Sequence, residues 1–317
     1  MKKLLVALFA LAVAVPALAQ QYPTRPVRIV VGFAPGGGVD ISARLLASKL
    51  SEYFGQQFII ENKPGAGTNI AAAEVAKSTP DGYTLFMNSP AVVINPALYA
   101  RPPYQLSEFI GISNFAATTN LLVVPAAVQA KTVQELVKLA KDKPGALNYS
   151  SAGQGTTQHL AGELFKLRTG TNIVHVPYKG SGPSMTALLA NEVQLSFINP
   201  VAAGGHVKAG KLRALAVTDG RRTELMPEVP TMKEAGVDGV EVSLWYALLA
   251  PAATPKEVVE KLGDAVGRAT KDAQVRDALK KQGADPVGNT PAQFNAYLKE
   301  ESARWSEVVR VSGARVE

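Results

Sequence analysis

Mainly apolar segments alternate with glycine-rich turns in the first third of the chain. The segment 27–33 is mostly apolar, the turn 34–38 carries three consecutive glycines, and apolar residues then recur at helical spacing from Ile41 to Leu50. A short apolar strand, an alanine-rich helix and a further strand follow. The pattern predicts the order strand, helix, strand, helix, strand over 27–33, 41–50, 58–60, 70–77 and 84–87.

The same order recurs in the middle of the chain. It predicts elements over 147–149, 159–166, 173–176, 185–190 and 193–198. Landmarks such as Gly36 and Gly153, or Pro90 and Pro200, keep a nearly constant offset. This agreement predicts two lobes built on one plan, although strand–helix units also have preferred lengths that can agree by chance.

Alternating strands and helices predict an α/β fold in which each lobe has a mixed or parallel sheet flanked by helices, and ligands of such sheets bind beyond the carboxyl ends of the strands. Both glycine turns fall at such ends, so a cleft between the lobes is expected. The apolar runs 120–125 and 244–251 are interpreted as strands that cross between the lobes. This interpretation assigns 20–123 and 244–317 to the first lobe and 124–243 to the second, with C-terminal helices over 256–271 and 291–310 closing the first.

Composition narrows the class of protein. The chain has 317 residues, 47% hydrophobic and 19% charged, which predicts a packed globular protein of about two domains. It contains no cysteine, which excludes disulfides, thiolate zinc sites, iron–sulfur clusters and cysteine nucleophiles. The net charge of +7 is mild, and no run of Lys and Arg beyond residue 19 exceeds two. No nucleic-acid partner is therefore expected.

The N-terminus has the pattern of a secretory signal peptide. Lys2 and Lys3 precede an apolar run over 4–15, and the tripeptide 17–19 reads Ala-Leu-Ala. That run spans about 18 Å as a helix, less than the roughly 30 Å of a membrane core, which disfavours a permanent anchor. We expect residues 1–19 to be cleaved and the mature protein to be a soluble periplasmic one.

A glycine loop before a helix presents backbone N–H groups and the positive end of the helix dipole, which together bind anions. Both lobes have such a loop. The loop at 33–40 matches neither the dinucleotide fingerprint G-x-G-x-x-G nor a phosphate loop. The glycines alone also suit a simple tight turn, but their recurrence at Gly153 and Gly155 favours an anion cleft. A valine at Gly36 is expected to block the approach to these N–H groups.

Several side chains next to the loops are candidate ligand contacts. Asp40 stands where the first helix begins, and capping that helix is favoured over holding a ligand hydroxyl or ammonium. Thr156 and Thr157 follow the second glycine turn and suit anion binding and helix capping equally.

Other candidates stand at strand ends on the same side of the predicted sheets. Asn88, Ser89 and Asn199 end strands there, where amides and hydroxyls can bind a small polar ligand. Tyr178 and Lys179 open a loop at the same face. Lys179 either supplies charge to the ligand or is simply solvated.

Catalytic and metal-binding patterns are not found. The three histidines, His159, His175 and His206, do not form H-E-x-x-H, and no G-x-S-x-G elbow occurs. His159 lies near the second glycine turn, and a structural role is favoured over ligand contact. Neither a cofactor nor a metal site is predicted.

Seven stretches of the chain match a known family in order and spacing: 33–40, 61–67, 81–85, 175–180, 210–217, 227–231 and 250–251. On these stretches the chain resembles the extracytoplasmic solute-binding (Bug-type) subunits of tripartite tricarboxylate transporters. The resemblance implies a two-lobed Venus-flytrap fold of the type II periplasmic-binding class. It also implies a receptor that closes on a small organic carboxylate, and we expect this receptor to deliver the ligand to membrane transporter subunits. We further expect a monomer without a cofactor.

The resemblance also implies which residues hold the ligand. In the first lobe the implied positions are Phe33, Ala34, Gly36, Gly37 and Asp40, and in the second lobe Ser151, Gly153, Thr156, Thr157 and His159. Departures from the family pattern at Gly38 and at 67–69 leave the selectivity open, and citrate, dicarboxylates, acidic amino acids and aromatic acids all stay possible. Two other roles for the same cleft also stay open, a ligand sensor for a membrane kinase and a periplasmic enzyme.

Overall fold

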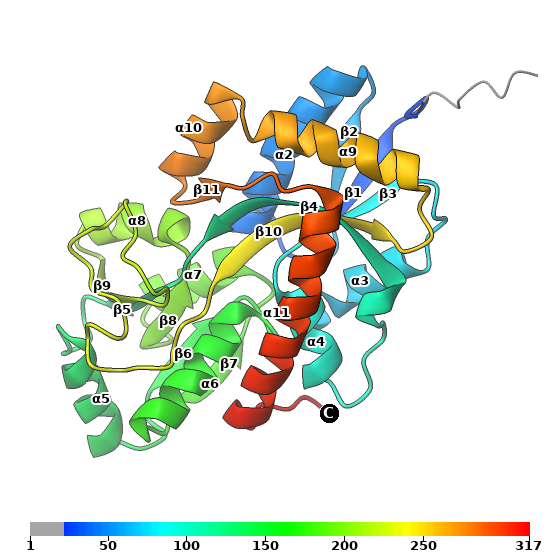
Figure 1. Ribbon diagram of the computed structural model, residues 1–317. Helices are drawn as coiled ribbons and strands as arrows, with labels where there is room; N and C mark the ends of the chain where they lie inside the picture. Colours follow the sequence, from blue (N-terminus) through cyan, green and yellow to red (C-terminus); the bar gives the residue numbers. More distant parts are fainter. Residues whose placement is uncertain (1–21) are drawn as a thin grey trace, which may run out of the picture.

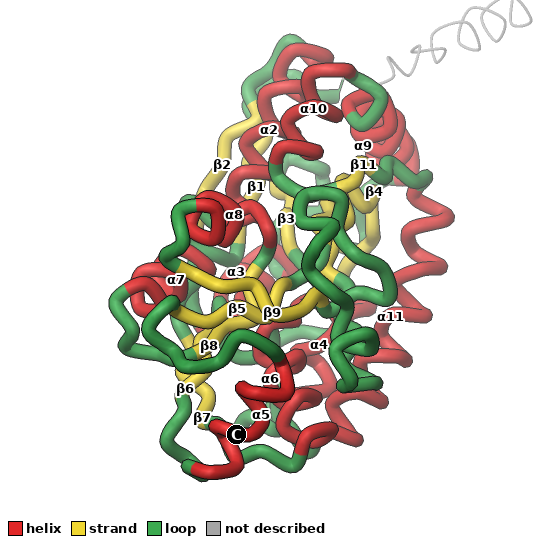
Figure 2. Tube along the Cα trace, turned by 90° about the vertical axis from the view of Figure 1, so that its left-hand side faces the viewer, coloured by secondary structure: helices red, strands yellow, loops and turns green. Residues whose placement is uncertain are grey.

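The computed structural model describes residues 22–317, with the side chain of Val201 excepted, so the predicted signal peptide at 1–19 lies outside the described residues. Two β-sheets, each flanked by helices, build the protein (Figures 1 and 2). Across the described part of the chain, no helix combines the length and apolar character needed to span a bilayer.

The first sheet has six strands in the order β11-β4-β10-β3-β1-β2. Its strands are β1 (Val27–Val31), β2 (Phe58–Asn62), β3 (Thr84–Asn88), β4 (Phe109–Thr118), β10 (Leu244–Pro251) and β11 (Asp285–Pro286). The helices of this part are α2 (Gly38–Phe54), η1 (Ala66–Thr68), α3 (Asn69–Ala76), α4 (Ala91–Leu98), η2 (Leu106–Glu108), α9 (Lys256–Ala269), α10 (Ala273–Lys281) and α11 (Pro291–Ser312).

The second sheet has five strands in the order β7-β6-β8-β5-β9. Its strands are β5 (Leu121–Pro125), β6 (Asn148–Ser151), β7 (Val174–Pro177), β8 (Leu195–Ile198) and β9 (Leu212–Val217). The helices of this part are α5 (Val133–Asp142), α6 (Thr157–Thr169), α7 (Ser181–Leu189) and α8 (Pro200–Lys208).

The two sheets share one topology, as the repeat in the sequence predicts. β1 lies between β2 and β3, β6 lies between β7 and β8, and both triplets are parallel. Each triplet is extended by two further strands through antiparallel pairing, first β10 and then β4 in the first sheet, and first β5 and then β9 in the second. The short strand β11 adds an edge to the first sheet alone. Both sheets are therefore mixed, each built around a parallel triplet, which confirms the predicted α/β fold with mixed or parallel sheets.

The interpretation of 120–125 and 244–251 as strands that cross between the lobes is wrong. β5 pairs only with β8 and β9, and β10 only with β3 and β4, so each strand belongs to a single sheet. The chain passes between the sheets instead at 119–120 and at 218–243. The lobe boundaries stay a prediction, with 121–123 paired in the second sheet rather than in the first.

Alternation of side chains along the strands distributes the core over both faces of each sheet. Ile29 and Val31 pack in the cluster that contains α2 and α9, whereas Val30 packs in the cluster that contains α3, α4 and α11. In the second sheet, Leu121 faces α7 and α8 and Leu122 faces α5 and α6. α11 also packs against α6, so this helix joins the two halves (Figure 1).

The return passage between the sheets is attached to α11. Arg304 donates hydrogen bonds to the Ser243 hydroxyl (2.9 Å) and to the Glu241 carbonyl (3.1 Å). Buried Glu301 pairs with Arg304 and accepts the indole N–H groups of both Trp245 (2.9 Å) and Trp305 (3.0 Å). One carboxylate thus connects β10, α11 and the passage into the first sheet.

Candidate functional site

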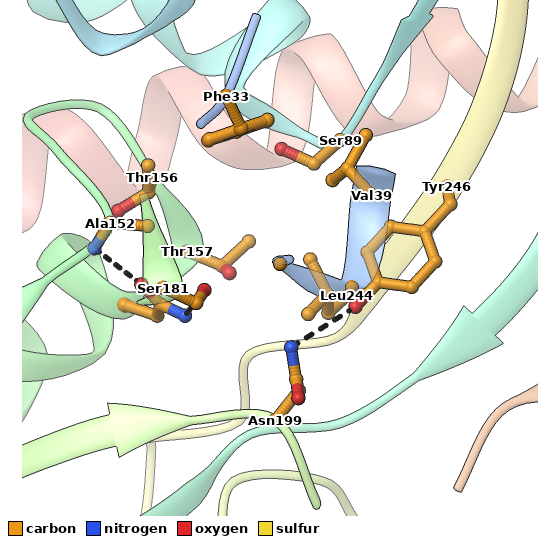
Figure 3. A pocket seen from close by; sticks show the side chains of 13 residues that line it. Phe33, Val39, Ser89, Ala152, Thr156, Thr157, Ser181, Asn199, Leu244 and Tyr246 are labelled. Carbon is orange, nitrogen blue, oxygen red and sulfur yellow. Dashed lines mark hydrogen bonds between the residues drawn. The ribbon is translucent and has the colours of Figure 1, made fainter. Parts of the chain in front are cut away.

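A small cavity lies between the two sheets, at the ends where the glycine loops meet (Figure 3). It offers about 30 Å³ to the centre of a water molecule. Its wall is contributed by both halves of the chain: Phe33, Gly37, Gly38, Val39, Ser89, Ala152, Thr156, Thr157, Gln158, Ser181, Asn199, Leu244 and Tyr246. None of these residues is an acid, a lysine, an arginine or a histidine.

Four helices begin at the cavity wall: α2, α6, α7 and α8. The first-turn N–H groups of a helix have no partner inside the helix. Among the described residues, no side chain caps α2 or α7, whereas Thr156 caps α6 and Asn199 caps α8. The convergence of these helix ends makes the cavity electropositive without any cationic side chain.

The lobes touch around the cavity, so the structure is closed. The Ala34 N–H donates to the Lys179 carbonyl across the cleft (3.1 Å). A Cβ at Gly180 would lie 3.2 Å from the Ala34 nitrogen, and a Cβ at Gly67 would overlap the Gln154 carbonyl oxygen on the opposite lobe. Glycines on both sides therefore permit the close approach of the two backbones.

Asp40 supports the first glycine loop from behind and is absent from the cavity wall. Its buried carboxylate accepts hydrogen bonds from the Gly36 N–H (2.9 Å), from the Arg44 guanidinium (3.0 and 3.1 Å) and from Asn62 (2.8 Å). Burial raises the pKa of this carboxyl, but the hydrogen bonds outweigh burial and hold the pKa below its ordinary value.

Gly36 is turned away from the cavity. Its φ is +86°, and a Cβ there would meet no atom within 4 Å, so a valine would strain the turn rather than block the cavity. The neighbouring Gly38 is the position where a Cβ would intrude, because it would overlap the Tyr246 hydroxyl. The prediction that a valine at Gly36 blocks the approach to the N–H groups is therefore wrong, because the valine would strain the turn instead.

The second glycine loop is held by neutral groups. Thr156 caps α6 through its bond from the His159 N–H (3.4 Å) and donates to the Gly153 carbonyl (2.7 Å). Ser151 also donates to the Gly153 carbonyl (3.0 Å) and contacts the His175 ring nitrogen (2.7 Å). Thr156 lines the cavity, whereas Ser151 lies behind it.

His159 and His175 form a buried stack behind this loop. Their rings lie 4.2 Å apart, and His175 also stacks on Tyr149 (4.7 Å). The His159 Nδ1 accepts the Gly155 N–H (3.3 Å). Burial lowers the pKa of His159 to about 4 and that of His175 to about 3, so both rings are neutral at pH 7. The structure places His159 in the support of the loop and not on the cavity wall.

The remaining predicted residues are divided between the wall and its surroundings. Ser89 and Asn199 line the cavity, and Asn88 is buried next to it, bonded to Thr68 (3.2 Å). Tyr178 and Gly153 line an adjacent cavity of about 240 Å³, which shares Ala152 with the first. Lys179 and Ala34 are in contact through the hydrogen bond from the Ala34 N–H to the Lys179 carbonyl, which joins the two lobes.

Seven wall residues were not predicted: Gly38, Val39, Ala152, Gln158, Ser181, Leu244 and Tyr246. Gly38, Val39, Ala152 and Gln158 directly adjoin predicted positions, and for Gly38, Val39 and Gln158 the place in a helix start was a usable signal. Leu244 and Tyr246 come from β10, far along the chain, and only the pairing of β10 with β3 brings them here. The place of Ser181 on the wall could not be predicted without knowing how the lobes close. Among the described residues, no group of acids and histidines is arranged to hold a metal ion.

Two flanked sheets enclosing a cavity at their facing ends define a two-lobed periplasmic binding protein. The closed fold matches the structure of a periplasmic transporter protein with a TM-score of 0.89 at 40% identity, covering 93% of this chain and 100% of that one. This finding confirms the predicted fold class.

The family model for the tripartite tricarboxylate transporter family receptor matches residues 42–313, and the chain belongs to this family of solute-binding receptors. BugT of Bordetella pertussis is 36% identical over 307 residues, covering 96% of this chain and 94% of that protein. Rpa4515 of R. palustris, solved with adipate, is 37% identical with a TM-score of 0.89 (93% and 100% covered). MatC of Rhodopseudomonas palustris, solved with malate, is 32% identical with a TM-score of 0.86 (91% and 100% covered).

Proposed function

We propose that this receptor captures a small organic carboxylate between its lobes and delivers it to the membrane subunits of a tripartite transporter. The observation that carries the proposal is the convergence of four helix N-termini on a cavity without charged side chains. Such a site attracts an anion and hydrogen-bonds its oxygens through fixed donors. Adipate in Rpa4515 and malate in MatC support the same ligand class for this chain.

Closure of the lobes completes the site and prepares delivery. The wall combines Gly38, Val39 and Tyr246 from one half with Thr157 and Ser181 from the other, so neither half holds the ligand alone. A ligand that contacts both halves favours the closed form by its differential affinity. The closed form then presents a surface that the transporter subunits can recognise.

We further propose that the protein performs no chemistry on its ligand. Tyr246 is the one ionisable side chain on the wall as described, and burial raises its pKa above the ordinary value. A neutral phenol with a raised pKa is a poor general base at pH 7. We also propose that the protein lies in the periplasm after removal of residues 1–19 and acts as a monomer.

Thermal unfolding of residues 20–317, stripped of co-purified ligand, tests the proposal against a panel of organic carboxylates. A ligand at a hundred times its Kd adds about 2.7 kcal/mol, which raises the Tm by several degrees. We expect a clear shift with one or a few acids and no consumption of the ligand. The absence of a shift with every acid would contradict carboxylate binding, and turnover of a shifting acid would favour an enzyme.

A further inference from the structure

The two passages between the sheets are bonded to each other at Asn120. This residue directly precedes β5, and its carbonyl oxygen accepts the Thr218 N–H (2.9 Å). Thr218 directly follows β9, and its hydroxyl lies within hydrogen-bond distance of two carbonyl oxygens, those of Asn120 (3.3 Å) and Val242 (3.1 Å). The Val242 N–H in turn donates to the Thr218 carbonyl (2.6 Å). The first passage and both ends of the second are therefore held together.

We call Asn120, Thr218 and Val242 the hinge cluster. All three residues are fully buried, so breaking a bond between them leaves a polar group without a partner and without water. Within residues 22–317 the chain crosses between the sheets only at the two passages. A rotation of one lobe against the other therefore takes place at or next to this cluster.

The side chain of Asn120 connects the hinge cluster to the cavity. Its Nδ2 donates to the Thr157 hydroxyl oxygen (3.2 Å). Thr157 is the first residue of α6 and lines the cavity, whereas the three residues of the hinge cluster are absent from the wall as described (Figure 3). Asn120 thus contacts a wall residue from behind.

The contact with Asn120 orients the Thr157 hydroxyl. A hydroxyl group has two lone pairs and one hydrogen, and the Asn120 N–H occupies one of the lone pairs. In the part of the chain that the structure describes, no protein acceptor is bonded to the hydrogen, which is left for an oxygen of the ligand. The amide of Asn120 therefore favours donation from Thr157 to a carboxylate.

We infer that Asn120 is a positioning residue for ligand capture, which orients the Thr157 hydroxyl toward the ligand and connects that contact to the hinge cluster. This inference rests on the proposed function. A ligand bonded to Thr157 is attached through Asn120 to both passages, and its release disturbs the bonds that hold them. Asn120 therefore controls affinity without touching the ligand, and it acts mainly on the dissociation rate.

Titration calorimetry with adipate, malate, succinate and citrate tests this role. Asn120→Asp keeps the size of the side chain but replaces the donor by an acceptor, which draws the Thr157 hydrogen away from the ligand. We expect the tightest acid of the four to bind this variant weaker by about tenfold or more. Asn120→Ala removes the amide without adding a charge and should weaken binding about tenfold.

Thr119→Val is the matched control for both variants. Thr119 is the neighbour of Asn120 in the same passage, and its hydroxyl bonds the Asn120 carbonyl (3.2 Å) rather than the wall. Its removal should leave the affinity within about twofold of the parent protein. Equal losses in Thr119→Val and Asn120→Ala would contradict a specific role for the Asn120 side chain.

A double-variant cycle distinguishes positioning from a general structural role. Asn120→Ala and Thr157→Val each remove one side of the same contact, and each should weaken binding about tenfold. The double variant should bind about as well as Thr157→Val alone, because Asn120 then has no hydroxyl to orient. Losses that multiply to about a hundredfold would overturn the positioning role.

Stopped-flow kinetics adds a second readout. Asn120→Ala should raise the dissociation rate about tenfold and leave the association rate within about twofold. A loss carried by the association rate would contradict the connection to the hinge cluster. Thermal unfolding without ligand establishes that each variant is folded, and Asn120→Asp and Asn120→Ala serve as independent tests.

The outcomes separate this inference from the proposed function. An acid that binds the parent protein and both folded Asn120 variants equally well overturns the inference and leaves carboxylate capture intact. Failure of all four acids to bind the parent protein contradicts both.

Discussion

The two glycine loops occupy equivalent places in the two halves, yet different chemistry supports them. Behind the first loop, the ionised carboxylate of Asp40 holds Gly36, Arg44 and Asn62. Behind the second loop, a neutral histidine stack holds Gly155 and Ser151. The shared backbone topology therefore fixes the direction of the backbone N–H donors in both halves. The side chains that hold each loop differ between the halves. Neither support places a charge on the cavity wall.

The largest effect is expected from removing the charged support. Asp40→Ala leaves the Gly36 N–H, Asn62 and Arg44 without their acceptor, and should lower the free energy of unfolding by about 2–4 kcal/mol. Urea unfolding measures this loss. Asp142→Ala removes the exposed partner of Lys138 at the same four-residue spacing and should change little. Similar stabilities for the two variants would show that Asp40 does not support its loop.

The neutral support predicts an acid-sensitive stability. Unfolded histidines bind protons near pH 6.5, whereas folded His159 and His175 do so only near pH 4 and 3. The unfolded state therefore binds more protons below about pH 6.5, and stability falls with pH by up to about 1.4 kcal/mol per unit for each histidine. Urea unfolding at pH 7, 6 and 5 measures the slope.

Glutamine variants test whether the stack of His159 and His175 causes this dependence of stability on pH. His159→Gln and His175→Gln should each flatten the dependence of stability on pH, even if they lower stability at pH 7. His206→Gln, on α8 outside the stack, should keep the slope of the parent protein. A slope that persists without both stacked histidines would place the acid sensitivity elsewhere.

A smaller effect distinguishes two adjacent glycines in the first loop. A Cβ at Gly38 would overlap the Tyr246 hydroxyl and approach Asn199 Nδ2 on the other half (2.9 Å), whereas a Cβ at Gly37 would lie 3.8 Å from Ser181. Gly38→Ala should therefore oppose closure and weaken ligand binding about tenfold, or about 1.4 kcal/mol, within the range of overpacking costs.

Calorimetry with the tightest acid of the panel measures both glycine variants. Gly37→Ala should stay within about threefold of the parent protein, because its Cβ makes an ordinary van der Waals contact. Equal losses in both variants would mean that strain in the loop backbone, rather than the overlap of the new Cβ with Tyr246 and Asn199, weakens binding.

The local pattern of apolar residues and glycines was sufficient to predict most of the fold, because the sequence repeat depends on spacing within short segments. The parallel triplets around β1 and β6 follow from it. The same pattern was insufficient to assign β5 and β10 to a sheet, since a run of buried residues indicates a central strand but not the sheet to which that strand belongs. The two glycine loops at the cavity were predictable from the glycines and from the helix starts that follow them. Tyr246 and Ser181 were not, because their place on the wall depends on pairing and closure between distant segments.

The carboxylate of Glu301 has an optical consequence. Trp245 and Trp305 are the two tryptophans of the chain, and both indole N–H groups donate to the same carboxyl oxygen of Glu301. Arg304, which pairs with Glu301, also holds the passage through hydrogen bonds to Glu241 and Ser243. A movement of that passage changes the electric field at both indoles together. We therefore expect the ultraviolet emission of the unlabelled protein to change when this passage moves.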